Sequence, residues 1–447
     1  MNSLKIVPFT MPCNGIIDVP GSKSISNRAL ILATLCRGRT ELSGILESED
    51  VSLMKKALSS LGVEIISGNQ KNSLFLNGCA GNLLVKEQKL YVGNAGTVAR
   101  FLTALLALQK GGIYQLDGCE AMRRRPMDEL IDALCSLGCR FEFQDIRGCF
   151  PFIMYSNGIE GDNWEVNATM SSQILSALLM ISPLINPAMN LSYRGGTVSE
   201  PFVDITLEMM KSFSSNQKFK YLKGEQKIHL ESVGYAVDDF VYEIEPDATA
   251  ASYFLTLPLA TGGECLVEGI SQEMLQGDSK YHLVLESVGF RVKEESNGLR
   301  SSVTKNLQAG NFDFNSISDT FLSLAAVSPL LKNEIVISGI AHTRKQETDR
   351  VQAMACELRK LGQGVIETED SLTILPNFEE LKRISKKDIE IETYEDHRFA
   401  MSFAILGSHD LHGNGRPWLT IKNPNCCAKT FPGFFENLDK IRVQSHS

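Results

Sequence analysis

The sequence lacks the short motifs that mark several common functional classes. It contains no Gly-Lys dipeptide, so the nucleotide-binding loop GxxxxGKS/T cannot occur. Its 11 cysteines include no CxxC pair and its 7 histidines no HExxH motif, so neither a zinc site nor a disulfide framework is expected. No run of about eighteen apolar residues is present, and the N-terminal segment has no apolar core of signal-peptide length. These absences favour a protein of the reducing cytoplasm, with no membrane or metal partner.

An excess of positive charge is missing as well. The 44 Lys and Arg residues and the 53 Asp and Glu residues leave a formal net charge of −9, whereas proteins that bind nucleic acid usually carry a basic surplus. Nucleic acid is therefore not an expected partner. The remaining composition, 43% hydrophobic and 22% charged, is that of an ordinary globular protein. Because 447 residues exceed what one hydrophobic core usually serves, we expect two domains.

The chain does contain an internal repeat. Six times a polar or charged segment leads directly into an apolar helical run, and these openings begin at residues 21, 93, 167, 245, 313 and 393, which lie 68 to 80 residues apart. Such self-similarity predicts a repeat architecture, here two domains of three units. The first turn of a helix presents unpaired N–H groups and a positive dipole end. Six helix starts gathered together would therefore form an anion-binding cleft.

A second marker keeps the same spacing: an amphipathic helix that ends at a Leu-Gly-like pair and leads into a short strand. The pairs are Leu61-Gly62, Leu137-Gly138, Phe213-Ser214, Val288-Gly289 and Leu361-Gly362. Apolar residues three and four apart predict helices over 54–62, 127–138, 282–289 and 351–362. Short strands are predicted over 63–66, 140–143 and 290–295, and strand hairpins over 217–240. This alternation indicates an α/β (α+β) fold.

Several of the helix openings carry cations and hydroxyl groups. In GSKSISNR, Lys23 and Arg28 would stand with several serines at a positive helix end, which suits a phosphate or carboxylate. In GNAGT, two glycines allow a ligand to approach closely and Thr97 would cap the helix. Arg125 begins another helix, and SSQ at 171–173 offers neutral donors and acceptors. Solvated turns, solvated arginines and simple caps are the ordinary alternatives for each of these motifs.

Acidic groups join the cations in the second half of the chain. Asp319 precedes an apolar helical run, where a carboxylate most often caps the helix. Glu347 and Arg350 are spaced i,i+3, so they either face the same cavity or form an ordinary surface ion pair. The EDHR segment brings an acid, an imidazole and Arg398 to another opening, and Lys429 is expected on a loop before the last helix. Each motif alone is common; their joint occurrence at the openings of a repeat is not.

Taken together, these segments closely resemble the 5-enolpyruvylshikimate-3-phosphate synthase family. The resemblance runs from about Ile6 to Phe435, almost the full chain. It rests on nine segments in family order: PGSKSISNRALILATL, GNAGTVARFLTALLAL, RRRPMDELIDAL, SSQILSALLM, VSEPFVDITLEMM, PDATAASYFL, ETDRVQAMACELRKLG, TYEDHRFAMSFAIL and CAKTFPGFF.

The resemblance implies two similar domains, each of three βαβαββ units, with substrates bound in the cleft between them. Residues 1–20 plus 245–447 would form a discontinuous domain that carries the catalytic acid/base and phosphoenolpyruvate residues. Residues 21–244 would form the domain that carries most of the shikimate 3-phosphate site. The implied reaction transfers the enolpyruvyl group of phosphoenolpyruvate to the 5-hydroxyl of shikimate 3-phosphate and releases phosphate, in the biosynthesis of chorismate and aromatic amino acids. No metal or organic cofactor is implied, and a monomer is expected.

The resemblance also implies residue roles. Asp319 would take the proton of the acceptor hydroxyl, and Glu347 would deliver or recover a proton at the methylene carbon, with Lys23 and Lys429 also catalytic. The implied substrate-binding positions are Lys23, Ser24, Arg28, Asn94, Gly96, Thr97, Arg125, Ser171, Ser172, Gln173, Ser199, Asp319, Gln346, Arg350, Arg398 and Lys429.

Three positions depart from the family pattern. Gln346 stands where a lysine usually faces shikimate 3-phosphate, and His342 stands where asparagine is frequent. Either this part of the site is rearranged or its affinity for the substrate carboxylate is weaker. Glu200, after Ser199, stands where a lysine can occur, and little effect is expected from it. Two other functions stay open from the residues: enolpyruvyl transfer to another acceptor such as UDP-N-acetylglucosamine, and non-catalytic binding of a phosphorylated metabolite.

Overall fold

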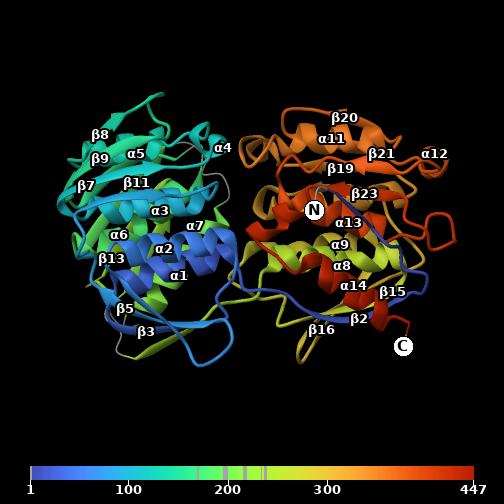
Figure 1. Ribbon diagram of the computed structural model, residues 1–447, viewed down its shortest axis with the longest axis horizontal. Helices are drawn as coiled ribbons and strands as arrows, with labels where there is room; N and C mark the ends of the chain where they lie inside the picture. The colour runs from blue at the N-terminus through green and yellow to red at the C-terminus, as the bar shows by residue number, and fades with distance from the viewer. Residues whose placement is uncertain are drawn as a thin grey trace. The chain divides into compact units, whose positions relative to one another are not determined.

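The protein is described by a computed structural model, which covers residues 3–168, 171–194, 200–214, 219–232, 234–235 and 239–446. The chain divides into two compact units. Unit 1 comprises Met1–Pro20 and Pro246–Ser447, and unit 2 comprises Gly21–Glu245. In Figure 1, unit 2 is coloured from blue to green, and unit 1 from yellow to red with the blue N-terminal strands added.

The described residues of unit 2 form three four-stranded sheets with one common strand order. In each sheet, a parallel pair of strands is extended by an antiparallel hairpin. The first sheet consists of β14 (Phe240–Glu243), β3 (Arg37–Ser43), β5 (Ser73–Cys79) and β4 (Glu64–Ser67). The second consists of β6 (Glu87–Tyr91), β7 (Lys110–Asp117), β9 (Phe152–Asn157) and β8 (Arg140–Phe143). The third consists of β10 (Asn163–Asn167), β11 (Ala188–Arg194), β13 (Lys227–Glu231) and β12 (Lys220–Gly224).

The helices of unit 2 are of two kinds. The opener helices are buried almost throughout and pack on one another: α1 (Lys23–Leu35), α3 (Gly96–Ala107) and α6 (Ser172–Ile181). The second helices bury one face: α2 (Glu49–Ser60), α5 (Asp128–Ser136) and α7 (Pro201–Phe213), with the short α4 (Glu120–Arg123) before α5. A helix that is apolar all round is stable only in a core, so the opener helices occupy the interior and the sheets lie outside them, as Figure 1 shows.

Unit 1 repeats this plan with one variation. Two sheets keep the four-strand order: β2 (Cys13–Asp18), β15 (Gly263–Glu268), β17 (Gly298–Val303) and β16 (Phe290–Glu295), then β18 (Gly310–Asp313), β19 (Ile335–Ser338), β21 (Ser371–Leu375) and β20 (Gly364–Glu367). The third has three strands, β22 (Ile389–Ile391), β23 (Leu419–Lys422) and β1 (Ser3–Lys5). Here β1 pairs antiparallel with β23, so the chain's first strand takes the place of the missing hairpin.

The opener helices of unit 1 are α8 (Ala248–Thr261), α10 (Phe321–Val327) and α13 (His397–Gly407), which pack on one another in the interior. The second helices are α9 (Tyr281–Val288), α11 (Arg350–Lys360) and α14 (Phe434–Gln444), and α12 (Phe378–Ile384) lies before β22. Each unit therefore has its own hydrophobic core. None of the helices in the described ranges is long and apolar enough to cross a bilayer.

The predicted second helices are confirmed as α2, α5, α9 and α11, with shifted ends. The largest shift is in α2, which begins at Glu49 rather than at residue 54. Ser48 caps this helix by accepting a hydrogen bond from the Val51 N–H at 3.4 Å, and two acidic residues occupy the first turn. Such a start satisfies orphan N–H groups and complements the helix dipole. The predicted short strands are β4, β8 and β16, and the predicted hairpin is β12–β13.

Candidate active site

In unit 2, the first site segment is the start of α1. Lys23 is the first helical residue, and its Nζ lies 3.6 Å from Oδ2 of the buried Asp50 in the first turn of α2. The side chain of Ser22, the N-cap residue, makes no capping bond, so the serine cap considered as the structural alternative is not formed by this residue. Ser24 is half-buried, and its carbonyl accepts from Arg28 at 3.0 Å. The positive end of α1 is thus not satisfied by a serine of its own cap.

Arg28 is almost completely buried. Its Nε donates to the Thr206 hydroxyl at 2.8 Å, and its Nη2 donates to the Ser176 hydroxyl at 3.0 Å and to the Phe202 carbonyl at 3.2 Å. The guanidinium carbon lies 5.2 Å from the ring centre of Phe101 and 5.7 Å from that of Phe202. Burial lowers the pKa of Arg28 to about 9, because desolvation penalises the charged form. These contacts, which bind α1 to α6 and α7, were not predictable from the motif around Arg28.

The start of α3 brings two guanidinium groups against one glycine. A Cβ atom on Gly96 would lie 2.7 Å from Nη2 of Arg125 and 2.9 Å from Nη1 of Arg100, so only glycine permits this approach. Nη1 of Arg125 donates to the Asn94 carbonyl at 3.4 Å. Thr97 was predicted to cap this helix, and that prediction is wrong. The N-cap position is Ala95, which has no side-chain acceptor, and Thr97 lies inside the first turn.

Arg100 connects this group to the start of α6. Its Nη1 donates to the Gly96 carbonyl at 3.2 Å and to Oε1 of Gln173 at 3.1 Å, and its Nη2 donates to the Pro126 carbonyl at 3.0 Å. Burial, and next the nearby charge of Arg125, lower the pKa of Arg100 to about 9. Arg100 was not among the predicted site residues, and its position near the GNAGT helix start was the available signal.

The SSQ segment occupies the start of α6. Ser171 is the N-cap residue, and its hydroxyl accepts from the Gln173 N–H at 3.2 Å. Ser172 is buried in the first turn. Capping is therefore at least part of what this segment does, as the structural alternative proposed. Ser199, also predicted to bind substrate, lies outside the described residues.

In unit 1, Arg350 is the centre of a dense ionic network. Its Nε pairs with Oδ2 of Asp396 at 2.7 Å, its Nη1 with Oδ1 of Asp319 at 2.8 Å, and its Nη2 with Oε2 of Glu347 at 2.7 Å. Oε1 of Gln346 accepts a further bond from Nη1. Desolvation lowers the pKa of Arg350, but the charges of Asp396, Glu347 and Asp319 outweigh it and raise that pKa above its ordinary value.

The same network contains the remaining predicted residues of unit 1. Arg398 pairs through Nη2 with Oδ2 of Asp319 at 2.6 Å, and Lys429 pairs through Nζ with Oε1 of Glu347 at 2.8 Å. Asp319 therefore bridges two arginines and does not cap α10, whose N-cap residue is Thr320. Lys429 ends a 3-10 helix, η6 (Pro424–Lys429), and not a loop as predicted.

Asp396 is a further residue of this network that sequence reasoning did not single out. It is fully buried, caps α13 by accepting from the Arg398 N–H at 2.9 Å, and uses its other oxygen for Arg350. Tyr394 and Glu395 precede it with φ of 54° and 57°, a left-handed turn that non-glycine residues adopt only at a cost. The EDHR segment was the available signal, but it contains two acidic residues and the sequence did not distinguish between them.

His342 and Gln346, two of the departures from the family pattern, both face this network. Nε2 of His342 lies 2.8 Å from the Ser318 hydroxyl, and burial lowers the pKa of His342. The amide oxygen of Gln346 is an acceptor for Arg350, a part that a lysine cannot play.

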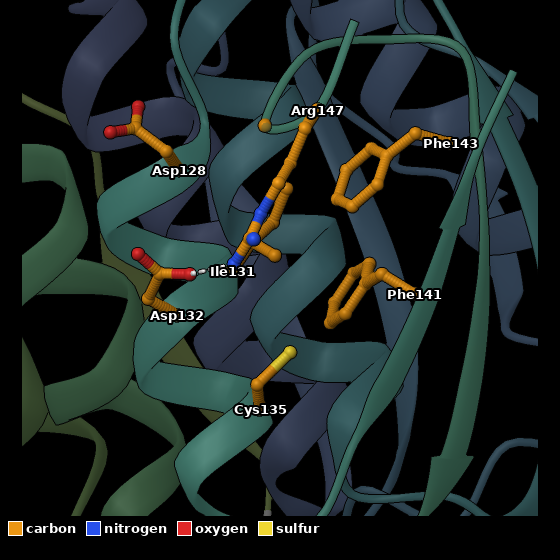
Figure 2. A pocket seen from close by; sticks show the side chains of 8 residues that line it. Asp128, Ile131, Asp132, Cys135, Phe141, Phe143 and Arg147 are labelled. Atoms are coloured by element: carbon orange, nitrogen blue, oxygen red, sulfur yellow. Dashed lines mark ion pairs between the residues drawn. The ribbon is translucent and has the colours of Figure 1, made fainter. Parts of the chain in front are cut away.

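A hollow of about 600 Å³ lies elsewhere in unit 2, over α5 and β8. Figure 2 shows Phe141 and Phe143 on one side, Asp128 and Asp132 on the other, and Arg147 paired with Asp132 at 3.8 Å. None of the predicted site residues lines it. In the described part of the chain, no three His, Cys, Asp or Glu side chains are grouped so that they could hold a metal ion.

Comparisons with known proteins agree on one family. Residues 9–438 match the family described as EPSP synthase (3-phosphoshikimate 1-carboxyvinyltransferase). The chain is 44% identical to the 3-phosphoshikimate 1-carboxyvinyltransferase of Opitutus terrae, over 99% of this chain and 98% of that protein. It is 36% identical to the enzyme of the same name from Nostoc punctiforme, over 99% and 100% of the two chains.

The fold is shared with solved structures. The EPSP synthase of Acinetobacter baumannii superposes with a TM-score of 0.78 at 23% identity, over 99% of this chain and 98% of that one. The predicted fold, family and transferase class are thereby confirmed. With a family match over nearly its whole length and full-length relatives well above 30% identity, the chain belongs to the EPSP synthase family.

Proposed function

We propose that the protein transfers the enolpyruvyl group of phosphoenolpyruvate to the 5-hydroxyl of shikimate 3-phosphate and releases phosphate. The observation that carries this function is the 44% identity to a 3-phosphoshikimate 1-carboxyvinyltransferase over 99% of the chain. The geometry supports it independently. Unit 2 presents buried cations at helix starts, which suit phosphate, and unit 1 presents two carboxylates among cations, which suit proton transfer between anionic substrates.

We assign shikimate 3-phosphate chiefly to the α1 and α6 starts of unit 2. Neither Arg28 nor Arg100 has a carboxylate within 4.0 Å in the described part of the chain, so an incoming phosphate or carboxylate would supply the missing counter-charge. The assigned residues are Lys23, Ser24, Arg28, Ser171, Ser172, Gln173 and Ser199, with Gln346 and Asp319 of unit 1.

We assign phosphoenolpyruvate to cations of both units. Arginine forks bind carboxylate and phosphate through paired N–H groups, and lysine adds a point charge. The close approach of Arg125 and Arg100 to Gly96 supports an anion site at the α3 start, since two like charges held together favour a shared anion. The assigned residues are Lys23, Asn94, Gly96, Thr97, Arg125, Arg350, Arg398 and Lys429.

Proton transfer falls to the two carboxylates of unit 1. Asp319 takes the proton of the 5-hydroxyl as its oxygen attacks. Glu347, bonded to the Lys429 ammonium at 2.8 Å, serves the methylene carbon. A proton from Glu347 adds to that carbon and makes it a methyl group, while the neighbouring carbon becomes cationic and accepts the oxygen. One methyl proton returns to Glu347 as the bond to phosphate breaks, and the hydroxyl proton taken by Asp319 leaves with the phosphate. Each proton transfer contributes about 10²–10⁴-fold.

Proton uptake by Asp319 would also change the charge that faces the arginines of this network. When Asp319 gains a proton it loses the negative charge that holds Arg350 and Arg398 at 2.8 and 2.6 Å. The two guanidinium groups are then available to the phosphate whose bond is breaking. Electrostatic stabilisation of this kind is strongest where water is excluded, and Arg350 is only 1% exposed.

We also propose that the protein acts as a monomer in the cytoplasm. All eleven cysteines are free thiols, which fits a reducing compartment, and the monomer follows the family resemblance. Light scattering of the purified protein tests the monomer.

Phosphate release tests the function. Purified protein is supplied with phosphoenolpyruvate and shikimate 3-phosphate, each alone and both together, with and without EDTA. We expect phosphate release only when both substrates are present. EDTA should not change this release, and the Asp319→Ala variant should abolish it. Release with UDP-N-acetylglucosamine in place of shikimate 3-phosphate would assign a different acceptor. Binding of shikimate 3-phosphate without any release would identify a non-catalytic binding protein.

A further inference from the structure

Asp278 is a buried carboxyl group that the reaction assigned above does not use. It lies in a single-turn 3-10 helix, η2 (Gly277–Lys280), and its residue is 9% exposed. Its Oδ2 accepts a hydrogen bond from the Thr249 hydroxyl in the first turn of α8. The preceding Gln276 accepts from the first N–H of α8 at 3.1 Å and donates to the Pro246 carbonyl at 2.7 Å. Both bonds tie η2 to the start of α8, so the carboxyl is held inside unit 1.

The position of η2 brings Asp278 close to the proposed base. η2 packs against η3 (Asn315–Ile317), the turn that leads directly to Asp319, and also against α8 and α9. The charged and titratable groups around Asp278 on these elements and on α13 are Asp319, Asp247, Arg398, the exposed Lys280 and the buried His282, whose Nδ1 lies 2.7 Å from the Ser279 carbonyl.

Asp278 changes its charge near neutral pH. Burial, and next the negative charge of Asp319, raise the pKa of Asp278 to about 7, while the Thr249 bond and the charge of Arg398 oppose this rise. Asp319 differs, because its two oxygens each face a guanidinium group. Among the described residues, Asp278 therefore has no cation at hydrogen-bond distance, whereas Asp319 has two.

We propose that Asp278 is a positioning residue whose negative charge makes Asp319 a stronger proton acceptor. The inference rests on the proposed function, in which Asp319 takes the proton of the 5-hydroxyl. A nearby like charge raises the proton affinity of a carboxylate, and the strength of a general base follows that affinity. Asp278 itself makes no bond to substrate, and no proton passes through it.

The test is the pH dependence of kcat in wild type, Asp278→Asn and Thr249→Val. Asparagine keeps the shape and the acceptor for Thr249 but cannot ionise. We expect its kcat to be within about twofold of wild type at pH 6, where wild-type Asp278 holds its proton. At pH 8.5 we expect kcat to be about three- to tenfold lower, because the loss of about one pK unit of basicity at Asp319 lowers the rate by at most tenfold. Thr249→Val leaves Asp278 able to ionise but removes a hydrogen bond that favours its ionised form. The rise in kcat that accompanies ionisation of Asp278 should therefore occur at higher pH in this variant.

The outcomes separate this inference from the function itself. An Asp278→Asn profile parallel to wild type, whether at full or uniformly reduced rate, would overturn the positioning role, since a merely structural defect is independent of pH. Wild-type protein that releases no phosphate at any pH would overturn the proposed function and this role with it. KM values for both substrates should stay within about twofold in both variants. If Asp278→Asn does not fold by circular dichroism, the shift expected for Thr249→Val decides alone.

Discussion

Arg28 in unit 2 and Arg350 in unit 1 are both almost completely buried arginines, but they have opposite surroundings. Arg28 is bonded to hydroxyls and carbonyls and lies over two phenyl rings. Arg350 is bonded to three carboxylates. The pKa values of the two guanidinium groups shift in opposite directions. Burial lowers the pKa of Arg28 to about 9, whereas the carboxylates raise the pKa of Arg350 despite its burial. Among the described residues, Arg28 therefore has no carboxylate partner, whereas the charge of Arg350 is compensated within its own unit.

This difference agrees with the division of roles proposed above. A buried cation without a counter-ion costs folding energy that an anionic ligand restores, which supports the proposal that Arg28 helps to bind an anionic substrate. In unit 1, the carboxylates Asp319 and Glu347 form ion pairs with the cations. In the proposed function, these ion pairs weaken when a carboxylate gains a proton or an anionic substrate binds. In the function proposed above, most contacts to shikimate 3-phosphate lie in unit 2, and both proton-transfer groups lie in unit 1.

The largest expected effect tests the proton-transfer half. Asp319→Asn keeps the size of the side chain but cannot take a proton, so we expect kcat to fall by about 10²–10⁴-fold. The Kd of shikimate 3-phosphate should change less than tenfold, because most of its assigned contacts lie in unit 2. Phosphate release gives kcat, and calorimetry gives Kd. If the variant kept its kcat but lost its affinity for shikimate 3-phosphate, Asp319 would act in substrate binding and not in proton transfer, which would contradict the proposed division of roles.

A pH-dependent stability is the next largest effect, and it belongs to unit 1. The folded protein holds the Asp278 proton up to about pH 7, whereas the unfolded chain releases it near the ordinary pKa of 3.8. Between these values the folded state binds more protons, so rising pH destabilises it, by about 1.4 kcal/mol per pH unit and about 3 kcal/mol from pH 5 to 7. Asp278→Asn should remove this slope, as measured by urea unfolding at each pH.

Asp117 of unit 2 provides the matched control. Its bonds to Arg123 lower the pKa of Asp117, so its contribution to stability is complete above the unfolded pKa and is lost only as pH falls through the folded pKa. Asp117→Asn should therefore leave the slope between pH 5 and 7 unchanged. An equal change of slope in both variants would show that the effect does not come from Asp278.

The opener helices and the Glu347–Arg350 spacing could be predicted from the sequence because both are local patterns. The partners of Arg28 could not, since Ser176 and Thr206 lie more than a hundred residues away and are ordinary helix residues in the sequence. The proposed role of Asp278 could not be predicted from the sequence either, because a Gln-Gly-Asp segment is most simply interpreted as a turn. The pairing of β1 with β23 escaped prediction for the same reason, as strand partners at the two ends of a chain leave no local signal.

The comparison between the two arginines can be sharpened by removing one partner from each. Asp396→Asn leaves Arg350 with one charged partner fewer in a fully buried position, and we expect it to cost about 3 kcal/mol of unfolding free energy. Thr206→Val removes a neutral hydroxyl from Arg28, and we expect about 1–2 kcal/mol. Denaturant unfolding measures both. If Thr206→Val were the more costly variant, Arg28 would depend on its neutral partners as much as Arg350 depends on its charged ones.

The smallest expected effect moves positive charge into unit 1. Gln346→Lys restores the cation that family members usually place toward shikimate 3-phosphate, and we expect KM for this substrate to fall about threefold, or roughly 0.7 kcal/mol. The new ammonium cannot accept the bond that Arg350 now gives to Oε1 of Gln346, and repulsion from the guanidinium should turn it away from Arg350. Gln346→Met is the matched control, because it also removes the acceptor but adds no charge. An unchanged or higher KM in the lysine variant, equal to that of the methionine variant, would mean that the Arg350 contact is worth more to the site than another positive charge.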